Sequence, residues 1–411
     1  MTILAGQLIQ YFRRQSGLTL EQLSKNICSI TYLSQLENNK RLPKEEILLE
    51  LCARLNLDIK RMYKADSLKL RKDLLSFYHF IQQRNEEEAD RMYHLITAAF
   101  HSQQQNYHME LYYELFVLNY FLFKKDLPAF QECYTLLDSK LLLMDKEQRY
   151  YFETIKGTYA LSYSSVKDAL TSFHLALSLE GKGKRGDLPY KMAIAYSRLN
   201  RLIRSNSCAE DAVALFQEEL NYLKVMDCYM ILGINFNLLG EYELSASYFQ
   251  KMIDSPINDL DPSFEGMLYH NYGYLLYNQK KFEEAEIHLK KSLHIRSNSP
   301  QACLGSLFLL SKVYMIMNNT EYASISINQG KEIASSENNK EYLLKFNFLS
   351  CQFREADQQE IEELLKNHII PYFERYGDED DFHYYVKTLA DLYYRQHKYK
   401  SASDYYKRMI T

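Results

Sequence analysis

The segment MLYHNYGYLLYNQKKFEEAEIHLKKSL, residues 267–293, decides the fold class of this chain. It reads as two helices, with Tyr269 and Gly273 in the first and Ala285 and Leu289 in the second. The small residues Gly273 and Ala285 stand where two paired helices cross closely, because a larger side chain there would hold the helices apart. The segment therefore predicts a helix pair.

The helix pair recurs along the chain at intervals of about 40 residues. MILGINFNLLGEYELSASYFQKMI, residues 230–253, repeats it clearly. Each unit is predicted to carry a small residue early in its second helix, and these residues are Ala89, Ala129, Ala169, Ala212, Ser245, Ala285, Ala323 and Ala402. Since the period exceeds about 34 residues and tryptophan is missing, the units resemble degenerate tetratricopeptide repeats. We expect about nine pairs, stacked in a right-handed superhelical solenoid with a concave groove.

The composition of the 411 residues agrees with an all-α protein, because 13 Gly and 7 Pro leave few breaks for a turn-rich β architecture. No apolar run approaches the roughly 20 residues that cross a bilayer, and the first residues lack a secretion signal. The seven cysteines are scattered without metal-ligand spacing. We therefore expect a cytoplasmic chain with reduced cysteines, without a bound metal, without a cofactor and without a membrane partner.

The N-terminal segment GLTLEQLSKNICSITYLSQLENNKRLP, residues 17–43, departs from the repeat pattern. Thr19 is a predicted N-cap with Gln22 three residues later, which is a capping box. The run at residues 28–30 leaves room only for a tight turn before a third helix, predicted from Thr31 to about Asn38. Residues 1–64 hold ten Lys or Arg against six Asp or Glu, about +4, whereas the whole chain carries -4. We call residues 1–64 the head. Its net positive charge favours binding to nucleic acid, whereas the charge of the remaining residues does not.

Residues 17–43 resemble the Xre-type helix-turn-helix, and the short NICS segment is similar to the version found in the Rgg, PrgX, PlcR and NprR group of peptide-pheromone receptors, the RRNPP family. The resemblance implies a DNA-binding domain over residues 1–64 and a repeat domain over residues 65–411 for peptide binding and dimerisation. It further implies a homodimer or higher oligomer on a two-fold-related double-stranded DNA operator, with a short signalling peptide as effector in quorum sensing.

In this motif the third helix enters the major groove with its N-terminal residues towards the bases. The residues that correspond to base readers are Ser29, Ile30, Thr31, Tyr32 and Gln35. Gln35 can pair with adenine and Ile30 can pack on a thymine methyl. The residues that correspond to phosphate contacts are Lys25, Lys40, Arg41 and Lys44, with Arg13 and Arg14 as further candidates. Because residues 29–35 hold no Arg or Lys, we expect weak guanine recognition.

The concave groove of such a solenoid is a predicted peptide site. An extended peptide exposes one N–H and one C=O per residue, and a carboxamide side chain offers a partner to both. A basic side chain there could take the carboxylate of the peptide's C-terminus. The positions that the repeat places in the groove are Arg201, Asn237, Asn271, Tyr274, Asn278, Lys312 and Lys387.

Catalysis is not expected, because the sequence contains no recognisable catalytic motif. His94, His101 and His108 recur every seven residues without an HExxH-like partner, and we interpret them as surface histidines. Two alternatives stay open beside peptide-controlled transcription. The repeats could sequester a protein partner, or they could dephosphorylate a response regulator, for which no catalytic residue can be identified.

Overall fold

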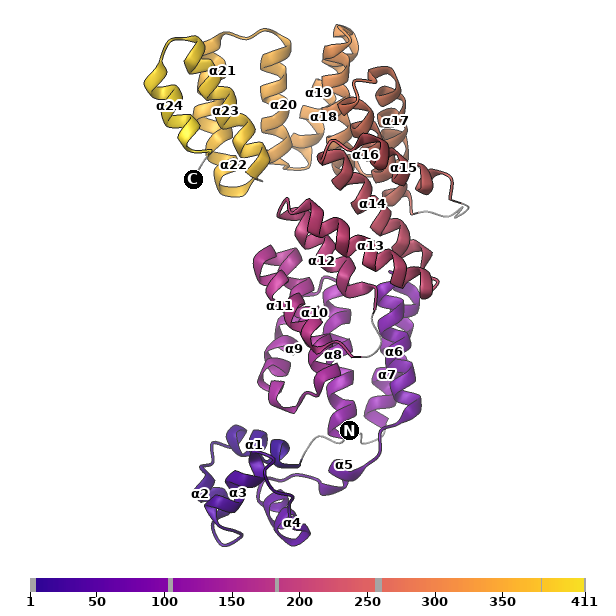
Figure 1. Ribbon diagram of the computed structural model, residues 1–411, viewed down its shortest axis with the longest axis vertical. Coiled ribbons are helices and arrows are strands. Elements are labelled where there is room, and N and C mark those ends of the chain that lie inside the picture. Colours follow the sequence, from indigo (N-terminus) through magenta and orange to yellow (C-terminus); the bar gives the residue numbers. More distant parts are fainter. Residues whose placement is uncertain (1–4, 103–105, 182–184, 256–260, 378, 410–411) are drawn as a thin grey trace. The chain divides into compact units, whose positions relative to one another are not determined.

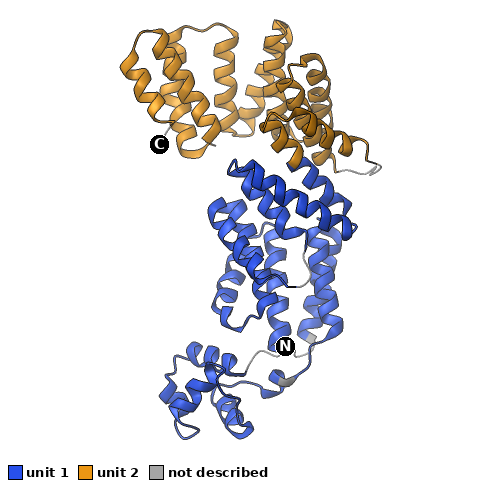
Figure 2. Cartoon of the chain, in the orientation of Figure 1, with its two compact units in different colours: residues 1–231 blue, residues 232–411 orange. Residues whose placement is uncertain are grey.

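The computed structural model describes residues 5–102, 106–181, 185–255, 261–377 and 379–409. Within these ranges the regular elements are all helices and no strand occurs, so the all-α prediction is confirmed (Figure 1). The chain divides into two compact units, residues 1–231 and residues 232–411 (Figure 2). This division falls inside the repeats, and the boundary between residues 64 and 65 stays a prediction.

The head consists of short helices whose starts and ends follow local chemistry. Thr19 caps the second helix as predicted: its hydroxyl accepts from the Gln22 amide at 3.1 Å, and the Gln22 side chain accepts from the Thr19 amide at 2.8 Å. Asn26 has a φ of 61°, a left-handed conformation that cannot continue the helix, which ends at Ser24. The helices are α1 (Ala5–Gln15), α2 (Leu20–Ser24), α3 (Ile30–Glu37), α4 (Glu45–Arg54) and α5 (Ile59–Tyr63).

Helix pairs fill the rest of the described chain. In the first unit they are α6 (Leu68–Gln82) with α7 (Glu86–Ser102), α8 (Tyr107–Phe123) with α9 (Leu127–Ser139), α10 (Lys146–Tyr163) with α11 (Val166–Leu179), and α12 (Asp187–Arg198) with α13 (Leu202–Glu218). A 3₁₀ turn, η1 (Leu141–Leu143), follows α9. Helix α14 (Tyr222–Leu238) contains the point of division.

In the second unit α15 (Tyr242–Ile253) packs on the end of α14, and four further pairs follow. They are α16 (Pro262–Asn278) with α17 (Phe282–Ile295), α18 (Pro300–Ile316) with α19 (Thr320–Ser336), α20 (Lys340–Phe353) with the composite helix α21 (Gln358–Leu364), η2 (Leu365–Ile369) and α22 (Ile370–Tyr376), and α23 (Glu379–Arg395) with α24 (Tyr399–Lys407). The segment η2 is a π-helix. The described residues thus form nine pairs.

The fourth residue of the second helix is buried in every pair except that of α21, where Ile361 is only partly buried. Ala169 and Ala285, for example, are fully buried. Two predicted positions are wrong: α9 places Phe130 rather than Ala129 there, and α13 places Ser205 rather than Ala212. The Ser205 hydroxyl donates to the Ala193 carbonyl at 2.7 Å, so a small polar residue fits where alanine was expected.

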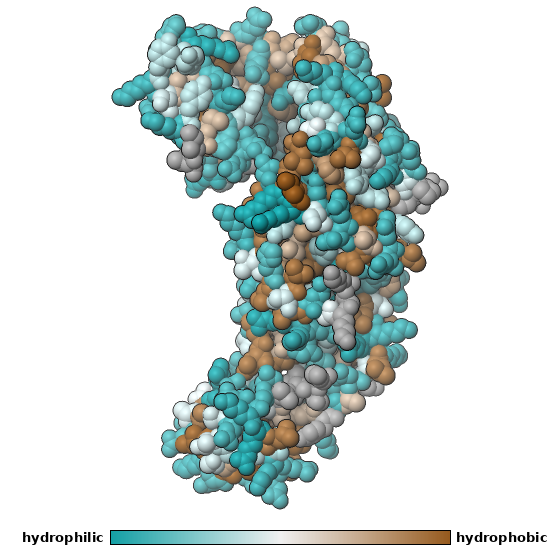
Figure 3. Space-filling view, viewed as in Figure 1, coloured by the Kyte–Doolittle hydropathy of each residue, from teal (hydrophilic) through white to brown (hydrophobic). Residues whose placement is uncertain are grey.

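The surface mixes hydrophilic and hydrophobic residues (Figure 3). None of the helices in the described ranges is long and apolar enough to span a membrane. Some large hydrophobic side chains are exposed, such as Ile203 at 79% and Ile287 at 65%.

Candidate functional site

Helix α3 presents short, uncharged side chains from its first turn. Ser29 is its N-cap, and the Ser29 hydroxyl accepts from the Tyr32 amide at 3.1 Å. The helix starts at Ile30, one residue earlier than predicted. Ile30 is 47% exposed, and Thr31 and Gln35 are exposed as well. The side chains of these three predicted base readers are therefore accessible on the protein surface.

Tyr32 does not belong with those readers, which corrects the prediction. It is 7% exposed, and its hydroxyl accepts a hydrogen bond from the Lys44 amide at 2.8 Å. The Arg41 guanidinium lies 4.4 Å from the centre of its ring. Tyr32 thus joins α3 to the start of α4 and holds Arg41 beside the recognition helix.

An ion pair behind α3 fixes its position. Arg13 of α1 donates to both carboxylate oxygens of Glu37, at 2.6 Å and 2.7 Å, and to the Leu18 carbonyl at 2.8 Å. The Arg13 and Glu37 side chains are only 11% and 2% exposed. Arg13 is therefore a structural residue, not the phosphate contact that was considered. Arg14 is exposed.

Gly6 marks the closest approach of α1 to α3. A Cβ atom at this glycine would lie 1.9 Å from the Leu36 carbonyl oxygen, so no larger residue fits without movement of the backbone. The sequence shows this only as one glycine in a short amphipathic helix, which is a weak signal.

The predicted phosphate contacts Lys25, Lys40, Arg41 and Lys44 are all exposed. Arg54 of α4 was not predicted from the sequence, but it stabilises the end of α2. The Arg54 guanidinium donates to the carbonyls of Leu23 at 2.9 Å and Lys25 at 2.6 Å, and so satisfies the open end of α2.

His108 lies at the junction between the head and the repeats, and its interpretation as a surface histidine is wrong. It is 5% exposed, with Nδ1 at 2.9 Å from an Asp66 oxygen and Nε2 at 3.0 Å from an Asp145 oxygen. Burial alone would lower its pKa, but the hydrogen bond to Asp145 and the charge of Asp66 outweigh burial and raise it. Both ring nitrogens can donate only in the imidazolium form.

Other contacts at this junction involve α5 and the start of α8. Arg61 pairs with Glu110 at 2.5 Å and lies 4.3 Å from the ring centre of Tyr107. Tyr107 also meets Phe12 of α1, edge to face, with ring centres 5.9 Å apart. Within the first unit, the head is thus joined to the repeats by charged and aromatic contacts.

The predicted peptide positions separate into different groups. Arg201 lies in the turn before α13 and not on the first helix of a pair, so it does not share the position of the other predicted residues. Asn237 is only 4% exposed, and its amide oxygen accepts from the Asn278 amide at 3.0 Å. Asn237 therefore joins α14 to α16 and does not present a free carboxamide, which corrects that prediction too. The Asn271 amide donates to the carbonyl of Met267 at 2.9 Å.

Tyr274, Lys312 and Lys387 remain on the surfaces of the first helices α16, α18 and α23. Tyr274 is 36% exposed and Lys387 is exposed, whereas Lys312 is partly buried. Burial lowers the pKa of Lys312, and the nearby Lys345 lowers it further against the opposing charge of Asp381.

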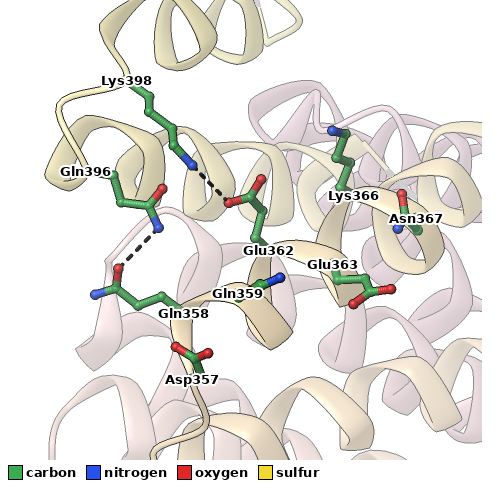
Figure 4. A pocket seen from close by; sticks show the side chains of 9 residues that line it. All are labelled: Asp357, Gln358, Gln359, Glu362, Glu363, Lys366, Asn367, Gln396 and Lys398. Atoms are coloured by element: carbon green, nitrogen blue, oxygen red, sulfur yellow. Dashed lines mark hydrogen bonds and ion pairs between the residues drawn. The ribbon is translucent and has the colours of Figure 1, made fainter.

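A polar pocket of about 790 Å³ lies elsewhere in the second unit, beside α21, the π-helix and the α23–α24 turn (Figure 4). Two contacts cross it: Lys398 to Glu362 at 3.5 Å, and Gln396 to Gln358 at 3.1 Å. It includes none of the predicted peptide positions. Over the described ranges no group of three or more His, Cys, Asp or Glu side chains could hold a metal ion.

Comparisons with known proteins agree with this arrangement. A helix-turn-helix model matches residues 9–61, and a tetratricopeptide repeat model matches residues 267–298. The chain is 31% identical over 400 residues to the transcriptional activator NprA of Geobacillus stearothermophilus, covering 94% of this chain and 97% of that protein. The chain belongs to the RRNPP family of peptide-responsive regulators.

The chain is also similar to a phosphatase of response regulators and to a solved structure of a peptide-bound regulator. Response regulator aspartate phosphatase I of Bacillus subtilis is 23% identical over 354 residues, covering 82% of this chain and 89% of that protein. The crystal structure of NprR in complex with its cognate peptide NprX has a TM-score of 0.65 at 17% identity, and covers 83% of this chain and 98% of that chain. This likeness confirms the repeat solenoid.

Proposed function

We propose that this family member is a transcription regulator that binds double-stranded DNA through residues 1–64 and is controlled by a short peptide bound to the repeats of residues 65–411. The observation that carries the DNA-binding half is α3, whose exposed Ile30, Thr31 and Gln35 are backed by the buried Arg13–Glu37 pair. A helix held this firmly can present hydrogen-bonding groups to base edges in a fixed register.

The four exposed cations Lys25, Lys40, Arg41 and Lys44 supply affinity that does not depend on sequence. Genome-wide occupancy mapping tests this role of the head. We expect the wild type to occupy discrete two-fold-related sites, the Gln35→Ala variant to shift its base preference, and the Lys40→Ala variant to lose occupancy evenly over all sites. Occupancy that is unchanged in both variants contradicts the proposal.

Support for the peptide response comes from two sources. The solved NprR structure that resembles this fold carries a peptide, and Asn271, Tyr274, Asn278, Lys312 and Lys387 lie on first helices of the repeats here. Peptide and operator binding are linked thermodynamically if the peptide changes the separation of two heads. Titration of a short synthetic peptide that the chain retains, with and without operator DNA at equal salt, tests this. Equal affinities in both titrations contradict the control mechanism.

We further propose that the active form is a homodimer or a higher oligomer, since one head covers one half of a two-fold operator. Sedimentation of the chain with operator DNA measures the stoichiometry directly. Two chains per operator are expected, and a single chain that binds with full affinity contradicts the dimer.

A second candidate function, dephosphorylation of a response regulator, is favoured by the match to the aspartate phosphatase over 354 residues. We propose that this chain acts by binding and not by catalysis. Phosphate release from phosphorylated response regulators of the source organism distinguishes the two. If the wild type accelerates phosphate release, the phosphatase activity is established and the hypothesis of a non-enzymatic function is rejected.

A further inference from the structure

Lys312 of α18 lies between two aromatic rings contributed by different repeats. Its ammonium is 4.6 Å from the ring centre of Phe308, one turn earlier on α18, and 5.9 Å from that of Tyr384 on α23. Tyr384 is 46% exposed, so one side of this arrangement is open to solvent. First helices of two different pairs, α18 and α23, therefore contribute the rings near Lys312.

The neighbouring Lys345 of α20 shows what Lys312 lacks. Lys345 pairs with Glu341 at 2.7 Å and with Asp381 at 2.5 Å. Over the described ranges, no carboxylate comes within 4.0 Å of the Lys312 ammonium. Of the two lysines in this cluster, one has two anionic partners and the other has aromatic faces only.

The pKa values of the two lysines have moved in opposite directions. The pKa of Lys345 is raised, because its two carboxylates outweigh the effect of burial. The pKa of Lys312 is lowered by burial and by the positive charge of Lys345, and the charge of Asp381 does not compensate. The surroundings therefore disfavour the Lys312 ammonium, although the ring faces stabilise it in part. An anionic group placed against it would remove this penalty.

We infer that Lys312 anchors a carboxylate of the peptide ligand, which binds at the ammonium between Phe308 and Tyr384. This inference rests on the proposed peptide response, and it specifies which chemical group of the peptide Lys312 recognises. A peptide offers such a carboxylate either at its C-terminus or on an Asp or Glu side chain. Both sources present the same group to Lys312, and an experiment separates them.

Four pools of short synthetic peptides of matched random composition serve as probes. They carry a C-terminal carboxylate or a C-terminal amide, and each form is made with Asp and Glu or with Asn and Gln in their place. Full-length wild type and Lys312→Met, Lys312→Arg and Lys251→Met variants are incubated with each pool, and retained peptides are identified by mass spectrometry. Lys251 is the matched control, because its ammonium also lies 4.6 Å from a ring, that of Tyr248, but on the second helix α15. Thermal unfolding checks that each variant is folded.

We expect the wild type and Lys251→Met to retain peptides from pools that hold a carboxylate and none from the pool that holds neither kind. The Lys312→Met variant should bind the selected peptide roughly ten- to hundredfold more weakly, as is typical for loss of a charge-assisted contact. Lys312→Arg keeps the charge and should keep the selection. Which pool the wild type prefers identifies the C-terminal or the side-chain source.

Two results overturn the inference while the peptide response stands: equal retention of the neutral pool by the wild type, or unchanged affinity in a folded Lys312→Met variant. If the wild type retains no peptide from any pool, the proposed peptide response fails, and this inference fails with it.

Discussion

The head and the second unit differ in how their predicted site residues are used. In the head, every predicted DNA contact except Tyr32 and Arg13 is exposed, and the Arg13–Glu37 ion pair that holds the helices is buried. In the second unit, Asn237 and Asn278 bond to each other, and Lys312 is partly buried among aromatic rings. Most of the predicted binding residues of the head are thus separate from its buried supporting contacts, whereas predicted binding residues of the second unit take part in the packing of its helices.

The largest expected effect tests that separation in the head. Replacing Glu37 by Gln leaves the buried Arg13 guanidinium without its carboxylate, which should cost about 3–5 kcal/mol. We expect the head to unfold and DNA binding to be lost, as measured by limited proteolysis and by operator titration. The exposed neighbour Arg14→Gln is the control and should change stability by less than about 0.5 kcal/mol. Similar losses in both variants would contradict a supporting role for the pair.

The next effect concerns the junction of the head with the repeats. His108→Gln removes charge-assisted hydrogen bonds to Asp66 and Asp145 and should lower the free energy of unfolding by about 1.5–3 kcal/mol. Chemical denaturation at pH 6 measures this loss.

The same histidine gives the wild type a pH dependence whose sign can be stated. Because the folded-state pKa of His108 is raised above 6.5, its stabilisation is complete below pH 6.5 and is lost as the pH rises through the folded-state value. Denaturation of wild type and His108→Gln at a series of pH values should therefore converge at the alkaline end. A difference that stays constant or widens with rising pH contradicts the charged form of His108.

The positions of site residues could be predicted from the sequence only where a motif fixes the ends of the helices. The capping box at Thr19 and the left-handed turn at Asn39 bracket α3 and place its start to within one residue, so Ile30, Thr31 and Gln35 could be placed by position. Burial of Tyr32 could not be predicted, because its partner is the amide of Lys44, twelve residues away.

In the repeats the period indicates helix pairs but not their register. Ala129 differs by one position from the residue that packs, Phe130, and Arg201 belongs to a turn instead of a helix. Contacts such as Asn278 to Asn237, which span about one repeat, depend on how neighbouring pairs stack. A degenerate repeat leaves that stacking undetermined, and single residues in it are therefore harder to assign than those of a short motif.

Two substitutions in α3, with smaller expected effects, distinguish a residue that contacts bases from one that stabilises the fold. Gln35→Ala removes an exposed amide and should reduce discrimination at one base position by about 1–3 kcal/mol without loss of stability. Tyr32→Phe removes the acceptor of the Lys44 amide and should cost about 1 kcal/mol of stability with the base preference intact. Binding to a randomised operator pool, together with thermal unfolding, measures both quantities. The opposite pattern would restore Tyr32 as a reader.

The smallest expected effect addresses the amides of the second unit. Asn278→Ala deprives the buried Asn237 of its donor and should lower the free energy of unfolding by about 1 kcal/mol, since an unsatisfied buried acceptor loses its hydration as well. Lys387→Ala, exposed on α23, is the control and should leave stability unchanged. Both variants are compared by denaturation without any peptide, so the measured difference in free energy of unfolding comes from the packing of the helices alone. If Asn278→Ala is as stable as the control, the hydrogen bond between the two amides does not stabilise the packing of α14 on α16, and Asn278 returns to the set of predicted peptide contacts.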